Sequence, residues 1–102
     1  MILITGHVIL TSERRERMIE LCTEHSARSR GEPGCLAHNC HIDVENPDLL
    51  MFVEEWESVD AVRAHFALPA ARAFVADMRA LSPQPPAIRI YAAEDITATL
   101  MG

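Results

Sequence analysis

Two segments of this chain, 1–10 and 49–56, carry apolar side chains at both odd and even positions. Successive side chains of a β-strand point to opposite faces, so both segments are predicted to be strands with two apolar faces. One layer of helices covers only one face of a sheet. A chain of 102 residues is long enough for one compact domain and no second one. We therefore expect a second copy of the chain to cover the other face, in a homodimer.

The other segments alternate between strand-like and helix-like hydrophobic periods. Ser12 and Ser58 are the expected N-caps of two helices, and Pro69 is expected to break the second helical pattern. The first expected elements are a strand at 1–10, a helix that begins at 13 and ends before Gly31, Pro33 and Gly34, and a hairpin of strands 35–44 and 49–57. A helix from 58 to the break at Pro69, a further helix that ends at Pro83, and a strand at 87–93 follow. The β-branched tail, 96–102, is expected to pair with another segment or to cross to the partner subunit.

This order, β-α-β-β-α-β, predicts an α+β fold of the ferredoxin-like type. In that fold a four-stranded antiparallel sheet carries its helices on one face. No linker, internal repeat or low-complexity segment interrupts the sequence. Residues 1–102 are therefore expected to form a single domain.

The charge of the chain excludes several classes of function. The formal net charge is -6 and all basic residues are scattered arginines, so a nucleic-acid partner is not expected. Because the sequence contains no lysine, it has no Schiff-base lysine and no P-loop lysine.

The cysteine count and the apolar runs bear on the compartment. Three cysteines are an odd number, and the first residues lack the basic region and cleavage site of a signal peptide. No apolar run approaches the ~20 residues of a transmembrane helix. We therefore expect a cytoplasmic protein that does not enter a membrane.

Two cysteines and two histidines lie within the seven residues 35–41. Strand alternation places Cys35 with His41 on one face and His38 with Cys40 on the other. Structural zinc is bound by four ligands in a tetrahedral arrangement, usually supplied from turns. Each face supplies only two, so no metal site is predicted here.

Glu54 lies between Phe52 and Trp56 on one face of the strand 49–57. Burial of an unpaired carboxylate costs several kcal/mol, so Glu54 is expected to have a partner, access to solvent or a raised pKa. His65, on the helix that follows, is the candidate partner. Two interpretations stay open: a structural Glu–His hydrogen bond, or a pair that lines a ligand cavity.

Several short motifs occur in a fixed order along the chain. They are Glu32-Pro33-Gly34-Cys35-Leu36, the Asn46-Pro47 turn, Phe52-x-Glu54-x-Trp56-Glu57-Ser58, Ala64-His65-Phe66, and Phe74. Together they resemble the antibiotic biosynthesis monooxygenase superfamily of dimeric α/β barrels, in its quinol-monooxygenase-like branch. The resemblance covers nearly the whole chain, from about Ile2 to Tyr91.

The resemblance implies a homodimer whose two sheets pack face to face, with a cavity between each sheet and its helices. It also implies oxidation of a phenol, hydroquinone or polycyclic aromatic by O₂ without flavin, haem or metal, so no cofactor is expected. Such a substrate supplies its own electrons once it is deprotonated. The protein then has to provide a base, an apolar pocket and exclusion of water.

The resemblance also suggests roles for single residues. His65 would be the general base, and Glu54 would orient it or take the proton itself. His38 stands where relatives often have tyrosine. The expected pocket residues are Trp56, Phe52, His38, Phe66, Phe74 and Val62.

A second function stays open beside the enzymatic one. The fold that the resemblance implies also serves lactone isomerases and stress proteins of unsettled activity, so the cavity could hold a small apolar ligand without catalysis. In that case Glu54 and His65 would be structural residues of a non-catalytic dimeric barrel.

Overall fold

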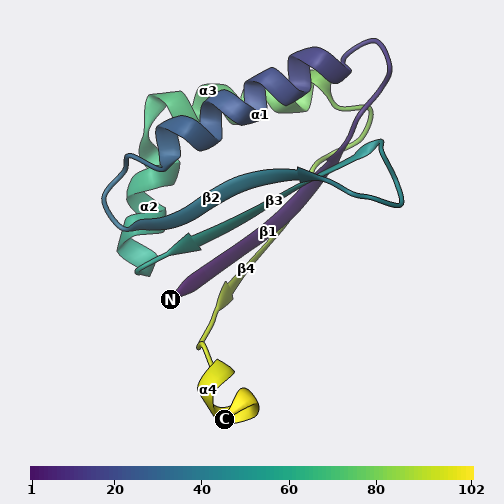
Figure 1. The fold of residues 1–102 in the computed structure, drawn as a ribbon. Coiled ribbons are helices and arrows are strands. Elements are labelled where there is room, and N and C mark those ends of the chain that lie inside the picture. Colours follow the sequence, from purple (N-terminus) through teal and green to yellow (C-terminus); the bar gives the residue numbers. More distant parts are fainter.

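The computed structural model describes residues 1–102 as a sheet with helices packed on one side (Figure 1). None of its helices is both long enough and apolar enough to span a bilayer. The elements are β1 (Ile2–Ile9), α1 (Arg15–Ser29), β2 (Cys35–Ile42), β3 (Leu49–Trp56), α2 (Val59–Ala67), α3 (Pro69–Leu81), β4 (Ala87–Ala92) and α4 (Thr97–Met101).

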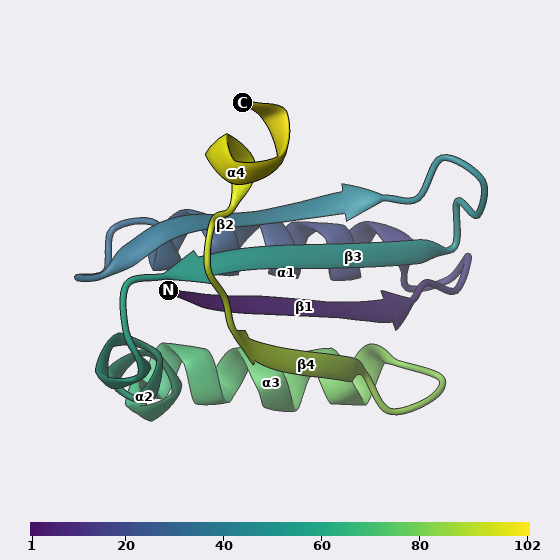
Figure 2. The same cartoon turned by 90° about the horizontal axis from the view of Figure 1, so that it is seen from below.

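The four strands form one antiparallel sheet in the order β2-β3-β1-β4. Helices α1 and α3 lie side by side on one face, and α2 lies at the end where β3 leaves the sheet (Figures 1 and 2). The predicted ferredoxin-like fold is confirmed. Its second helical segment is split into α2 and α3, as Pro69 predicted.

The helix boundaries follow local chemistry. At the start of α2, the Ser58 hydroxyl accepts a hydrogen bond from the Ala61 backbone N–H at 3.1 Å, which confirms the predicted N-cap. Leu68 ends α2 and precedes Pro69, which is the first residue of α3. The prediction for α1 is wrong: Ser12 lies in a turn, and Arg14 occupies the N-cap without a side-chain hydrogen bond.

The core lies between the sheet and the helices. Even-numbered residues of β1 and β3 are buried there, whereas their odd-numbered neighbours are half-buried on the other face. One cluster comprises Val8, Leu10, Met18, Leu21, Cys22, Leu50, Phe52, Phe74 and Met78; a smaller one comprises Ile2, Ile4, Trp56 and Val62.

No helix covers the opposite face of the sheet, which Figure 2 shows in front of the helices. Leu3, Ile9, Met51 and Val53 lie there among more polar residues and are only partly shielded. The two apolar faces predicted for β1 and β3 are thus present, one covered by helices and one not.

A bulge at the start of β2 changes the predicted faces of that strand. Cys35 pairs with Trp56 and Ala37 with Glu55, so the register shifts by one residue between them. Cys35 therefore packs against the smaller core cluster, and Leu36 is 52% exposed. The expectation that Cys35 shares a face with His41 is wrong.

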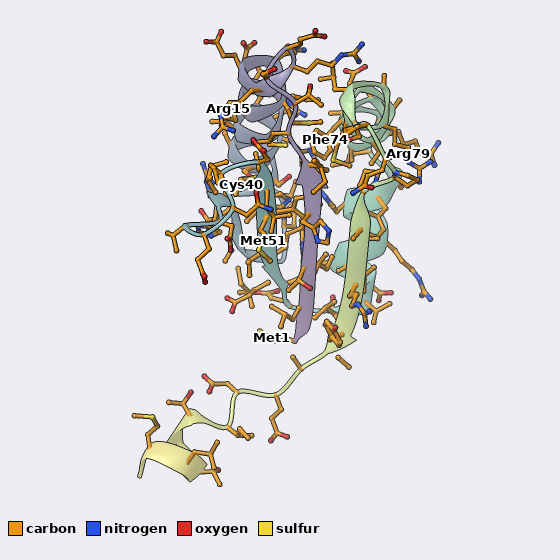
Figure 3. All side chains as sticks on the ribbon, turned by 90° about the vertical axis from the view of Figure 1, so that its right-hand side faces the viewer. Met1, Arg15, Cys40, Met51, Phe74 and Arg79 are labelled. Atoms are coloured by element: carbon orange, nitrogen blue, oxygen red, sulfur yellow. The ribbon has the colours of Figure 1, made fainter.

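The tail does not pair as a strand with any segment of its own chain. Residues Thr97–Met101 form the short helix α4, and the Asp95 carboxylate accepts a hydrogen bond from the Thr97 backbone N–H at 2.9 Å. Figures 1 and 3 show α4 extending away from the sheet. Its Leu100 and Met101 are exposed.

Gly6 of β1 leaves room for a large side chain of the neighbouring strand. A Cβ at this position would collide with Cε2 of Phe52 and lie 2.6 Å from the Ala87 carbonyl oxygen. The backbone oxygen cannot move away without disturbing the β1–β4 ladder. The absence of a side chain at Gly6 therefore makes room for the Phe52 ring.

We expect Gly6→Ala to lower the free energy of unfolding by about 1–3 kcal/mol, because a methyl group overpacks this site. Urea unfolding measures the change. Gly31→Ala is the matched control, since its nearest neighbour, the Arg28 carbonyl oxygen, lies at an ordinary 3.5 Å. Equal stability of the two variants would contradict this account of Gly6.

Candidate functional site

Glu54 is a buried carboxylate on the helix-covered face of β3, only 5% exposed. The Trp56 indole N–H donates a hydrogen bond to its Oε1 at 3.0 Å. His38 stands directly opposite Glu54 in the sheet, with Nε2 3.3 Å from the same oxygen. The expected pairing of Glu54 with His65 is wrong, because the cross-strand neighbour and the residue two positions along the strand are closer.

The contacts of Glu54 lower its pKa by more than burial raises it. Burial raises the pKa of this carboxyl, but the nearby His38, the Trp56 hydrogen bond and the charge of His65 together hold it below its usual range. Glu54 is therefore ionised near neutral pH. It is an acceptor of hydrogen bonds and a weak base.

His38 connects the sheet to α1. Its Nδ1 lies 2.8 Å from the hydroxyl of the buried Ser26. Its Nε2 approaches Glu54 without the alignment of a hydrogen bond, so this fully buried nitrogen has no hydrogen-bond partner.

His65, near the end of α2, is buried and has a different carboxylate partner from the one expected. Its Nδ1 lies 2.7 Å from Oε1 of Glu32, in the loop between α1 and β2. Its ring also lies against Trp56, with 4.6 Å between ring centroids. The contact with Glu32 leaves Nε2 of His65 available for other chemistry.

Gly34 allows the loop that carries Glu32 to approach α2. Its φ of +82° is a conformation that favours glycine, and a Cβ there would lie 2.6 Å from Cβ of Ala61. Ala61 is one helical turn before His65, on the same face. The Pro33-Gly34 corner thus brings Glu32 to the histidine. The sequence shows this corner but gives no sign of the partner 33 residues away.

His25 of α1 completes a cluster of three buried imidazoles that the sequence analysis missed. Its ring stacks on Phe74, with centroids 3.8 Å apart and planes 1° from parallel. The centroids of His38 and His65 lie 5.0 Å and 5.2 Å from it. The available signal was its helical spacing from Met18, Leu21 and Cys22 on the buried face of α1.

Burial, followed by the charges of His38 and His65, lowers the pKa of His25 to about 3. The ring is therefore neutral at pH 7. It can accept one hydrogen bond or ligand through a lone pair, and it does so without an opposing charge.

A cavity of about 380 Å³ opens beside these groups, between the sheet, α2, α3 and β4. Glu54, His25 and His65 contribute its polar lining. The remaining wall is largely apolar, apart from the arginines Arg72 and Arg79 of α3. In Figure 3, Phe74 lies between the helices and the sheet, whereas Arg79 lies on the outer side of α3. The volume is within the range of small-molecule sites.

The predicted pocket residues fall into two groups. Phe52, Phe66 and Phe74 line the cavity, and Glu54 and His65 meet there too. Three others are corrected: Trp56 and His38 lie behind Glu54 rather than in the cavity wall, and Val62 packs in the core with Trp56. Residues that the sequence analysis did not place at the cavity are His25, Ala71, Arg72, Val75, Arg79, Pro86, Ala87 and Ile88.

The pKa of His25 predicts a loss of stability in acid. This pKa is about 3 in the folded protein, whereas a histidine in the unfolded chain has a pKa of about 6.5. The unfolded chain therefore binds more protons between these values, and stability falls as the pH drops through them. His25→Phe keeps the stack on Phe74 and removes the titration. We expect the loss of unfolding free energy between pH 7 and pH 4.5 to be about 1–2 kcal/mol smaller in this variant.

Urea unfolding in buffer with EDTA measures this difference at both pH values. His41→Phe, at an exposed histidine on the other face of the sheet, is the control and should retain the full loss. The same loss in His25→Phe as in the unmodified chain would show that another group is responsible.

A family model described as antibiotic biosynthesis monooxygenase matches residues 1–77 of the chain. Among curated proteins, an uncharacterised protein of Synechocystis sp. is 29% identical over 90 residues. That match covers 88% of this chain and 61% of the relative, so the chain spans about three fifths of the relative's length.

Solved structures show the same fold at low sequence identity. A Deinococcus radiodurans protein named after the same family has a TM-score of 0.88 at 23% identity, covering 93% of this chain and 94% of that one. A conserved protein of Methanosarcina mazei has a TM-score of 0.86 at 19% identity, covering 91% and 92%. A Mycobacterium tuberculosis protein has a TM-score of 0.86 at 19% identity, covering 92% and 95%.

Proposed function

Because this chain belongs to the antibiotic biosynthesis monooxygenase family, we propose that it oxidises a phenol or hydroquinone with O₂ in the cavity beside Glu54 and His65. The family predicted from the sequence motifs is confirmed. The observation that carries the proposal is that His65 lies at the wall of a largely apolar cavity and that its Nδ1 is held by the Glu32 carboxylate.

His65 is the better base of the two polar groups. When the Nδ1–H group donates a hydrogen bond to the Glu32 carboxylate, Nε2 carries the lone pair that takes a proton from the substrate. Glu54 is the weaker base, because its surroundings hold its pKa below the usual range. Its negative charge nearby instead stabilises the imidazolium that His65 becomes.

The reaction balances without an external reductant. The phenolic proton goes to His65, and the electron-rich ring carbon forms a bond to O₂. The peroxide takes up that proton. Loss of the hydrogen on the same carbon and cleavage of the O–O bond then give a quinone and one water. The substrate supplies all the electrons, and the apolar wall keeps bulk water from the intermediates.

We expect His65→Gln to lower kcat by about 10²–10⁴-fold, the usual contribution of a general base. Glu32→Gln keeps a polar partner but loses its charge, so we expect a smaller reduction of kcat. Oxygen uptake and quinone formation, measured over a panel of hydroquinones and naphthols with EDTA present, check both variants. Glu24→Gln, on the exposed face of α1, is the control.

The same panel separates the two functions considered from the sequence. Tight binding of an aromatic without oxygen uptake would favour the non-catalytic ligand-binding barrel. An unchanged rate in His65→Gln would exclude this histidine as the base.

We also propose that the uncovered face of the sheet is the dimer interface. The half-buried Leu3, Ile9, Met51 and Val53 lie on that face, and no element of the chain covers them. The exposed Leu100 and Met101 on the projecting helix α4 are placed to contact a second copy. Family members of this size are typically dimeric, which supports the same interpretation.

Light scattering should give twice the 11.4 kDa mass of the chain at micromolar concentration. Val53→Glu places a charge in the proposed interface and should shift the mass toward the monomer. Val44→Glu is the matched control, because Val44 is 98% exposed after β2. A monomeric unmodified chain, or equal effects of the two variants, would contradict the interface.

A further inference from the structure

The proposed oxidation uses one of the three buried histidines and leaves the other two without a role. His25, His38 and His65 come from α1, β2 and α2, yet one ring nitrogen of each lies within 4.8 Å of the others. All three residues are buried. Apolar packing does not require three imidazoles at one point, and each buried ring nitrogen needs a partner.

The outer nitrogens of two of these rings are already held. Glu32 contacts Nδ1 of His65 at 2.7 Å, and the Ser26 hydroxyl contacts Nδ1 of His38 at 2.8 Å. Histidines that bind metals characteristically have the second nitrogen fixed in this way by a carboxylate or another polar group. In both rings Nε2 is the nitrogen that remains for a ligand.

The inner nitrogen of His38 is the independent sign of a missing partner. It is completely buried and makes no hydrogen bond. The closest polar atom is Oε1 of Glu54, at 3.3 Å and poorly aligned. A cation between the nitrogen and the carboxylate would satisfy both groups.

We propose that His25, His38 and His65, together with Glu54, bind a divalent first-row transition-metal ion such as Zn²⁺ or Co²⁺. Three imidazoles and one carboxylate are suitable ligands for these ions.

The cluster has to contract to hold such an ion. Bonds of 2.0–2.1 Å in a tetrahedral site place ligand nitrogens about 3.3 Å apart, less than the present spread of up to 4.8 Å. The rings are inclined to one another by 43° to 79°. We therefore expect side-chain rotations to bring the nitrogens together without parallel rings colliding.

Metal binding does not depend on the proposed oxidation, but a bound ion would affect that oxidation. An ion on Nε2 of His65 occupies the lone pair that would otherwise take the substrate proton. If the proposed oxidation occurs, Zn²⁺ should inhibit it and EDTA should restore it. Binding itself is measured without any substrate, so the two proposals fail separately.

The experiment is a titration of EDTA-treated, dialysed protein with Co²⁺, followed by visible d–d absorption. We expect saturation at one ion per chain, intense bands typical of a four-coordinate site, and displacement by Zn²⁺. His25→Phe and His65→Gln should each weaken Co²⁺ binding by at least about tenfold, and Glu32→Gln by about 10–100-fold. His41→Phe, at an exposed histidine outside the cluster, should bind as the unmodified chain does.

Circular dichroism and thermal unfolding show whether each variant is folded, and only folded variants are compared. Absence of d–d absorption in the unmodified chain would overturn the proposal. So would weak binding at several ions per chain, or a loss of affinity in His41→Phe equal to that in His25→Phe. Retained affinity in both cluster variants would overturn it as well.

Discussion

A negative charge buried in the core sets the arrangement of the site. Transfer of an unpaired carboxylate out of water costs several kcal/mol, so Glu54 is compatible with folding only when donors surround it. Trp56 donates a hydrogen bond from the same strand, and the imidazole of His38 lies 3.3 Å away on the adjacent one. His38 in turn requires Ser26 at its other nitrogen, which ties α1 to the sheet at this point. One charge thereby fixes the relative positions of three elements.

The parts of this arrangement that follow local periodicity could be predicted from the sequence. Alternation placed Phe52, Glu54 and Trp56 on one face, and Pro69 predicted the break between α2 and α3. The pairing of His65 could not be predicted, because it depends on how closely the loop at Gly34 approaches α2. The bulge after Cys35 could not be predicted either, because one extra residue in a strand leaves no recognisable pattern in the sequence.

The histidine cluster is a further case in which tertiary structure overrides the sequence signal. The seven residues 35–41 contain two cysteines and two histidines, all potential metal ligands. The strand places them on two faces, and only His38 reaches the site. Neither His25 nor His65 has another histidine or a cysteine within two positions in the sequence. Ligands that converge from three elements leave no motif, whereas burial on a helical stripe is visible and was the better guide to His25.

The break at Leu68 and Pro69 divides the walls of the cavity between two rigid bodies. α2 holds His65, while α3 contributes Ala71, Phe74, Val75 and Met78 to the wall. Side chains on α3 can therefore change size without altering the backbone that positions the histidine. With this division the lining of the cavity can change while His65 stays in place, so divergence among relatives should concentrate on α3 more than on α2.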